Sequence, residues 1–240
     1  MYETIQSDLY TLPAMVTFIP EQNTARASLE QFIHDVYAKQ YDADIKHFMP
    51  ALMGLHSQNG SYLAALGMRP ADQEHLFLEH YLDKPIEKLL SAATHYEANE
   101  ISRNSIVEVG NLAAHHAGGT RWLIIALTAY LQGAGYDWVA FTSVASLRNS
   151  FRKLGLKLFK LGDAELSHLP ENEQANWGRY YETHPEVMAV NVHYTYGVLE
   201  KLLRVEQTLT ALRDIWQQSF TFGHVARYQA MQHQALQHTG

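Results

Sequence analysis

The sequence has no cysteine, no excess of positive charge and no apolar stretch long enough to cross a membrane. The absence of cysteine excludes disulfides, thiolate nucleophiles and zinc–thiolate sites. The 18 Lys and Arg residues against 25 Asp and Glu residues give a net charge of −7, which argues against a nucleic-acid partner. The longest apolar run, 122–131, is about half of the roughly 20 residues that a membrane-spanning helix needs.

Several catalytic signatures are also missing. The sequence contains neither His-Glu-x-x-His nor Gly-x-Ser-x-Gly, and the pair Gly118-Gly119 is not followed by the Lys-Ser/Thr of a P-loop. We therefore expect no metal site, no serine nucleophile and no nucleotide triphosphatase. The first eight residues carry acids but neither the basic nor the apolar region of a secretory signal, which predicts a cytoplasmic protein.

The order of apolar patterns predicts an α/β or α+β fold on a mixed sheet. The pair Asn59-Gly60 between two apolar runs indicates a β-hairpin, and a polar loop is expected at 170–176. Strands are expected at 14–19, 51–56, 61–67, 106–109, 137–142, 156–161 and 187–192; helices are expected from Asn23 or Thr24 to Tyr37, at 85–95, 122–131 and 146–154, and as one long helix from Val198 to Trp216.

One segment combines a strand, a glycine pair and a helix. Ile106–Val109 is β-branched, Gly118 and Gly119 free the backbone to turn, and the run 122–131 is apolar enough to pack as a helix. Free amides at such a helix N-terminus bind anions, and a phosphate or pyrophosphate is the natural ligand. The alternative is that the glycine pair only terminates a strand-to-helix turn.

Charged and polar residues around this turn have two interpretations each. Arg121, at the helix start, would contact the phosphates or remain a plain surface arginine. His115 and His116 would donate to a pyrophosphate or transfer protons near neutral pH, or they are ordinary loop histidines among the 14 in the chain.

Glu108 lies inside an apolar strand between Val107 and Val109. A carboxylate buried there is costly without a partner, and burial raises its pKa toward neutrality, as suits a general base for an ammonium nucleophile. The alternative is a structural ion pair with Arg103 or Arg148.

Two further groups of residues are candidates. Glu79 and its neighbours His80 and Asp83 would line an acceptor pocket, although Asp83 also suits a helix cap. If Glu108 is structural, then His115, His116 and Glu79 are the next candidates for the catalytic base. The aromatic residues Trp177, Tyr180 and Tyr181 would form a wall for an acyl chain, or simply belong to the core.

The order of these elements resembles the GNAT acyltransferase fold, in which the turn after the fourth strand holds the pyrophosphate of an acyl-CoA. His115, Gly118 and Thr120 stand at the three places of the family pattern Arg/Gln-x-x-Gly-x-Gly/Ala, and both ends depart from the usual residue types. Phe151 stands where the family has its general-acid Tyr, so that acid is missing. The resemblance also implies that Asn149 hydrogen-bonds the pantetheine arm.

A closer resemblance is to the thermostable hemolysin family, over roughly residues 13 to 195. The motifs that carry it stand in order along the chain, at 81–87, 106–114, 126–131, 147–149, 154–156 and 177–181. The family is thought to share the GNAT-like core and is distantly similar to acyl-homoserine-lactone synthases, whose corresponding strand carries a Glu at a place like Glu108. The resemblance therefore implies a GNAT-like domain at 1–195 and a helical extension at 196–240.

These observations together predict an acyltransferase that uses an acyl-CoA, or the phosphopantetheine thioester of an acyl-carrier protein, to acylate a small amine. The amides of Val109 and Asn111 would orient the thioester, the glycine turn would hold the phosphates, and Glu108 would deprotonate the amine. The alternatives are a membrane-active lysin acting through helices at 197–236, and a non-catalytic protein that binds acyl thioesters. Contact with a membrane surface and a homodimer stay open.

Overall fold

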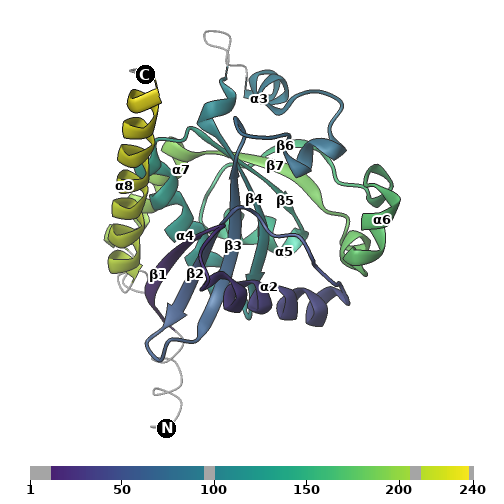
Figure 1. Ribbon diagram of the computed structural model, residues 1–240, viewed down its shortest axis with the longest axis horizontal. Coiled ribbons are helices and arrows are strands. Elements are labelled where there is room, and N and C mark those ends of the chain that lie inside the picture. The colour runs from purple at the N-terminus through teal and green to yellow at the C-terminus, as the bar shows by residue number, and fades with distance from the viewer. Residues whose placement is uncertain (1–11, 95–100, 206–211, 238–240) are drawn as a thin grey trace.

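The computed structural model describes residues 12–94, 101–205 and 212–237, which form one seven-stranded mixed sheet covered by helices on both faces (Figure 1). The strand order is β1-β2-β3-β4-β5-β7-β6, and the β4–β5 pair is parallel while the other neighbours are antiparallel. The strands are β1 (Pro13–Pro20), β2 (Ala51–Ser57), β3 (Tyr62–Pro70), β4 (Ile106–Ala114), β5 (Trp138–Ser143), β6 (Phe159–Asp163) and β7 (Glu186–Asn191).

The helices divide between the two faces of the sheet. Valines 107 and 109 of β4 face one side, where α4, α5, α7 and α8 pack, while Ile106 faces the other side with α3 and the 3₁₀ helix η1. The α-helices are α2 (Arg26–Tyr41), α3 (Ile86–Thr94), α4 (Ala117–Ala134), α5 (Ala145–Lys153), α6 (Glu171–Gln174), α7 (Val192–Val205) and α8 (Arg213–Gln237); the 3₁₀ helices are η1 (Phe77–Tyr81), η2 (Arg103–Ser105), η3 (Leu166–His168), η4 (Ala175–Trp177) and η5 (Tyr180–Thr183).

The predicted mixed sheet and its strands are confirmed, with shifts at several ends. Gly60 takes the positive φ of 84° that the hairpin between β2 and β3 requires, which confirms the Asn59-Gly60 turn. Strand β6 starts at Phe159, three residues later than expected. The expected loop at 170–176 instead holds α6 and the start of η4, so that prediction was wrong.

The expected helices at the C-terminal end also differ from the structure. One long helix was expected up to Trp216, but the structure has α7 and α8 on either side of 206–211, which lie outside the described residues, as does His95 at the expected end of α3. Leu212, Ile215 and Trp216 join the same core as α4. The C-terminal helices therefore pack onto the same core as the sheet.

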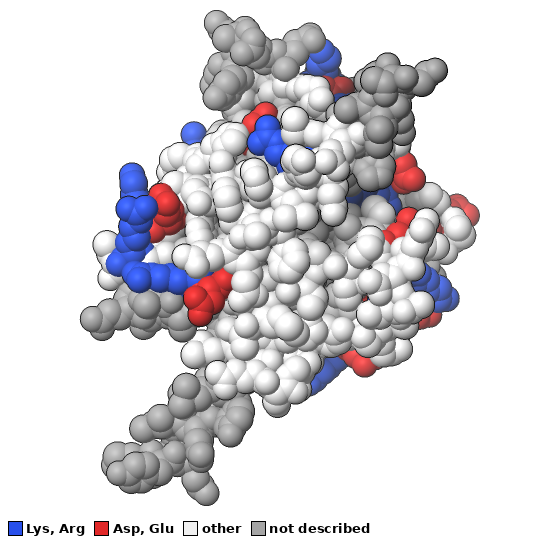
Figure 2. All heavy atoms as spheres, turned by 60° about the vertical axis from the view of Figure 1, so that its left-hand side comes forward, with Lys and Arg blue, Asp and Glu red and all other residues white. Residues whose placement is uncertain are grey.

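Helix α8 crosses α4 at two glycines. A Cβ added to Gly223 would lie 2.0 Å from the carbonyl oxygen of Tyr130, and one added to Gly133 would lie 2.3 Å from that of Phe220. The two backbones therefore touch at this crossing. The outer side of α8 exposes apolar residues such as Tyr228 and Met231, within a broad area that carries few charged side chains (Figure 2).

We expect Gly223→Ala to lower the free energy of unfolding by about 2–3 kcal/mol, because the added methyl group forces the two helices apart. Gly197→Ala on α7 is the matched control, since a Cβ there has no heavy atom within 4 Å. That control should raise stability by about 0.5–1 kcal/mol through helix propensity. Urea denaturation of both variants measures the difference, and equal stabilities would contradict the close crossing.

Candidate active site

The sheet splits into two halves after the first part of β4. Parallel pairing between β4 and β5 covers only four residue pairs and ends at Val109 and Phe141. Beyond that point β4 stays paired with β3 as far as Ala114, while β5 stays paired with β7 as far as Ser143. The two strands therefore diverge, and the backbone of β4 after Val109 faces an opening rather than a neighbouring strand.

A bulge at Asn111 shapes the edge of this opening. Gly110 pairs with Gly67 and Ala113 with Ala65, so β4 carries one residue more than β3 between those pairs. Asn111 takes a positive φ of 51°, which asparagine tolerates better than most residues. Its side chain accepts a hydrogen bond from the Met49 amide (2.9 Å) and donates one to the His47 carbonyl (3.2 Å). The bulge therefore fixes the segment 45–49 beside the opening.

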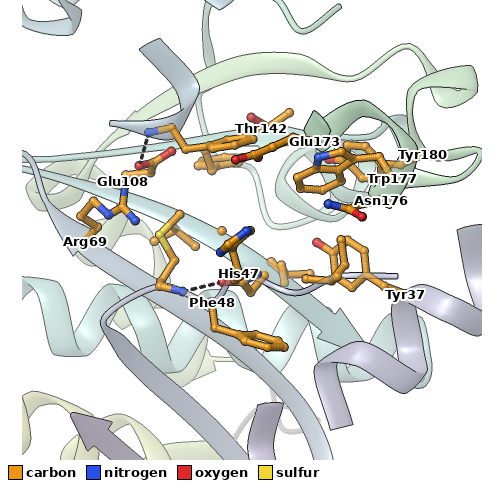
Figure 3. Close-up of a pocket in the computed structure, with 18 of the residues that line it drawn as sticks. Tyr37, His47, Phe48, Arg69, Glu108, Thr142, Glu173, Asn176, Trp177 and Tyr180 are labelled. Atoms are coloured by element: carbon orange, nitrogen blue, oxygen red, sulfur yellow. Dashed lines mark hydrogen bonds between the residues drawn. The ribbon is translucent and has the colours of Figure 1, made fainter. Parts of the chain in front are cut away.

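A pocket lies at this opening (Figure 3). Its walls come from β3 and β4, the segment 45–49, η1 and the stretch 173–181, and much of its surface is aromatic. The lining includes Tyr37, His47, Arg69, Glu108, Thr142, Glu173, Trp177, Tyr180 and Tyr181. The three aromatic residues at 177–181 thus lie in the pocket wall, and their contact with an acyl chain stays a prediction.

Glu108 is the buried carboxylate of this pocket, with 2% of its surface exposed. Its two oxygens accept hydrogen bonds from the backbone amides of Phe77 (2.9 Å) and Leu78 (2.8 Å), at the start of η1. Burial raises the pKa of Glu108, and the two amides and the charge of Arg69 lower it less. The structure therefore holds a carboxylate of raised pKa at the deep end of the pocket.

The expected alternative for Glu108 was an ion pair with Arg103 or Arg148, and neither arginine pairs with it. Arg103 instead binds Glu79 and Glu87, and Arg148 binds Glu186 at 3.1 Å. Two backbone amides, rather than an arginine, bind the Glu108 carboxylate, because η1 begins directly above β4. Each carboxylate oxygen of Glu108 therefore keeps a lone pair for a ligand.

Glu79 was expected as a further candidate base, but it does not line this pocket. Its carboxylate accepts hydrogen bonds from Arg103 (2.7 and 3.0 Å) and from the amides of Leu76 and Ile86 (both 3.0 Å). Burial raises its pKa, but Arg103 and the two amides outweigh that effect and lower it to about 2. Glu79 is therefore an ionised structural group that joins η1 and α3, and we remove it from the candidate bases.

A second cleft lies at the N-terminus of α4 and adjoins the first. The two share five lining residues, among them Thr142 and Tyr180. The cleft is further lined by His115, Thr120 and Ser146. No carboxylate lies among its described lining residues, so a phosphate-bearing group meets no anion there. Its position at a helix N-terminus suits an anionic group such as a phosphate.

Helix α4 starts at Ala117 rather than at Trp122, so the expected glycine turn is instead the first turn of the helix. Gly119 packs against β3, where an added Cβ would lie 3.1 Å from the Leu63 carbonyl oxygen. His116 caps the helix, because its ring accepts a hydrogen bond from the Gly119 amide at 3.3 Å. Gly119 is therefore needed for close packing on β3, and His116 caps the helix.

The remaining candidates divide between the lining and the surface. His115 and Thr120 line the second cleft, whereas Gly118, Gly119 and Arg121 line neither cleft. Asn149 is exposed and accepts a hydrogen bond from Arg152 (3.1 Å), while its helix neighbours Ser146 and Ser150 line the cleft instead. Val109 and Asn111 line the main pocket, and the contact of their amides with a thioester stays a prediction.

Several lining residues were not anticipated from the sequence. Arg69 reaches the pocket because β3 places it directly opposite Glu108, a register that no local pattern encodes. Tyr37 comes from α2 and is part of both clefts. Phe151, at the place of the missing tyrosine, is buried and stacks on Phe141 with ring centroids 5.1 Å apart.

Comparisons with known proteins agree on the fold. A comparison with curated proteins finds no match. Among solved structures, the chain is similar to a CoA-dependent acyl-homoserine lactone synthase, BjaI, with SAM and isopentyl-CoA: the TM-score is 0.52 at 13% identity, over 84% of this chain and 98% of that one. It is also similar to TofI in an apo form, with a TM-score of 0.52 at 14% identity over 83% of this chain and 97% of that one. A third similar structure is FeeM, an N-acyl amino acid synthase from uncultured soil microbes, with a TM-score of 0.51 at 15% identity over 77% of this chain and 94% of that one.

These likenesses show that the chain shares the fold of these synthases. The sequence itself matches a family model over residues 19–196, which is most of the chain. The chain therefore belongs to the thermostable hemolysin family.

Proposed function

We propose that this protein transfers an acyl group from a thioester of coenzyme A, or of an acyl-carrier protein, to a small amine. The observation that carries the proposal is the divergence of β4 and β5 directly beside a buried carboxylate, Glu108. A thioester laid into that opening would bring its carbonyl carbon to the pocket, and its pantetheine arm would continue into the cleft at α4. BjaI, of the same fold, is described with isopentyl-CoA, which supports this class of donor.

The unpaired edge of β4 supplies the donor contacts in this proposal. Beyond Val109 the strand has no pairing with β5, so backbone amides around Asn111 can hydrogen-bond the thioester oxygen. Amides of the first turn of α4 would face the phosphates, with the positive end of the helix dipole. Thr120 and Ser146 would add hydroxyl donors from the two helices on either side.

Glu108 would act on the amine. The acceptor arrives as an ammonium ion and loses one proton to Glu108, directly or through water. Its nitrogen then attacks the thioester carbonyl, the C–N bond forms, and the C–S bond breaks. The second proton leaves the nitrogen as the tetrahedral intermediate collapses, and the products are an amide and the free thiol.

The missing tyrosine does not prevent this reaction. A thiol has a pKa near 8.5, so a thiolate is an adequate leaving group close to neutral pH without a general acid. Phe151 is part of the apolar core rather than of the pocket, and it contributes no proton donor. We therefore expect protonation of the thiolate by solvent.

The lysin and the non-catalytic binding protein are the competing proposals. None of the helices in the described ranges has the length and apolar character needed to cross a bilayer. Apolar residues on the outer side of α8 favour contact with some apolar partner, but a structured pocket with a buried carboxylate is not needed for lysis. A protein that only binds thioesters would not need Glu108 to be ionised.

For the donor, we expect CoA or a matching acyl-CoA to bind with a Kd on the order of 1–100 μM. Ser146→Glu places a negative charge in the second cleft and should weaken binding roughly tenfold or more. Asn149→Glu, on the same helix but outside both clefts, is the control and should bind as the parent does. Calorimetry with a panel of CoA thioesters and acyl-carrier proteins measures both, and no binding by the parent protein to any of them would contradict the donor site.

For the base, Glu108→Gln should lower the acyl-transfer rate by about 10² or more at pH 7 while donor binding persists. Burial raises the pKa of Glu108, so the parent rate should rise with pH as this carboxyl ionises. The variant lacks that step, and its deficit should shrink at higher pH as the amine loses its proton unaided. Pre-steady-state rates against pH decide this, with thermal unfolding as the folding control. A fully active variant at pH 7 would identify Glu108 as purely structural.

For the lysin alternative, purified protein should release no dye from liposomes unless substrates that yield a lytic product are added. The reason is that α8 carries only three charged residues, Arg213, Asp214 and Arg227, so its attraction to anionic lipid is weak. Dye release with and without an acyl donor and an amine measures this. Leakage at nanomolar protein alone would favour the lysin.

A further inference from the structure

Arg69 has an incompletely satisfied side chain in the main pocket. Its Nε is buried and has no hydrogen-bond partner among the described residues, and the nearest carboxylate oxygen, from Glu74, lies 3.9 Å away. The Glu74 side chain is 69% exposed and does not line the pocket, whereas that of Arg69 is 22% exposed and does. A guanidinium offers five N–H donors in a planar fork, so Arg69 keeps donors for a ligand.

Arg69 and Glu108 lie side by side at the same end of the pocket (Figure 3). They are register partners on the antiparallel strands β3 and β4, so their Cα atoms are about 5 Å apart and their side chains share one face. The ion pairs of the described residues do not include one between them. Glu108 is held by the amides of Phe77 and Leu78 instead.

A guanidinium and a carboxyl group therefore face one cavity without an ion pair between them. The complementary ligand carries a positive group near Glu108 and a negative group near Arg69. An amino acid has this arrangement, because a single carbon separates its amine from its carboxylate. The other titratable groups that line the cavity are Lys46, His47 and Glu173 with four tyrosines, and none of them is a register partner of Glu108.

We propose that the acyl acceptor is an amino acid, or a zwitterion of the same spacing, whose carboxylate is bound by Arg69 while its amine lies at Glu108. This inference rests on the acyltransferase function proposed above. Arginine binds a carboxylate through two parallel N–H bonds, which both orients the acceptor and selects against a simple amine. The bond changes are those already given: the amine nitrogen is acylated, and the carboxylate stays bound and unchanged.

The test compares acceptors that differ only in the carboxylate. Amino acids and their decarboxylated counterparts, such as leucine with 3-methylbutylamine and tyrosine with tyramine, are each supplied with an acyl-CoA, and released thiol is measured. We expect kcat/KM for the preferred amino acid to exceed that for its amine about 100-fold. Arg69→Gln should remove most of that preference by lowering the amino-acid rate, and Arg69→Lys, which keeps the charge, should fall between.

Glu74→Gln is the matched control, because it changes the residue nearest the buried Nε without touching the pocket, and it should leave the preference unchanged. Equal rates for amino acids and amines, or equal losses for both in Arg69→Gln, would overturn the inference and leave the acyltransferase function standing.

Titration of the same acceptors into the CoA-loaded protein separates the two proposals. Carboxylate-dependent binding lost in Arg69→Gln without any acyl transfer would overturn the proposed function alone, and neither binding nor transfer would overturn both.

Discussion

The two halves of the sheet are joined by four residue pairs between β4 and β5, and the candidate site depends on where that pairing stops. A parallel pair that continued to the ends of both strands would close the sheet and leave no opening. The bulge at Asn111 turns the last part of β4 toward β3, and the Asn111 side chain binds the segment that ends at Met49. One backbone irregularity therefore creates the opening and also positions part of its wall.

Two buried carboxylates with opposite electrostatic surroundings stand behind this site. Glu79 has an arginine and two amides as partners and stays ionised, which ties η1 to α3. Glu108 has two amides from η1 but no bound cation, and burial raises its pKa. Pairs of carboxyl groups whose environments push their pKa values apart are typical of sites where one group is structural and the other reacts. Glu79 therefore contributes to the site indirectly, by holding the amides that orient Glu108.

The family name and the fold point to different activities, and the geometry favours the fold. The pocket combines a buried carboxyl group with a facing arginine and adjoins a cleft at a helix N-terminus, which is the geometry on which the proposed acyl transfer rests. The outer side of α8 exposes several apolar side chains in an area with few charged ones (Figure 2).

The sequence by itself determined the mixed sheet, the hairpin at Asn59-Gly60 and the burial of Glu108, because strand alternation and turn chemistry are local properties. It did not reveal the role of the glycines, since whether Gly119 approaches a ligand or packs on β3 depends on a strand more than fifty residues earlier. The sequence offered Glu79 as a second candidate base after Glu108, and only the tertiary structure places Arg103 beside Glu79. Only the tertiary structure placed Arg69 opposite Glu108, because register between strands is set by the packing of whole faces rather than by neighbouring residues.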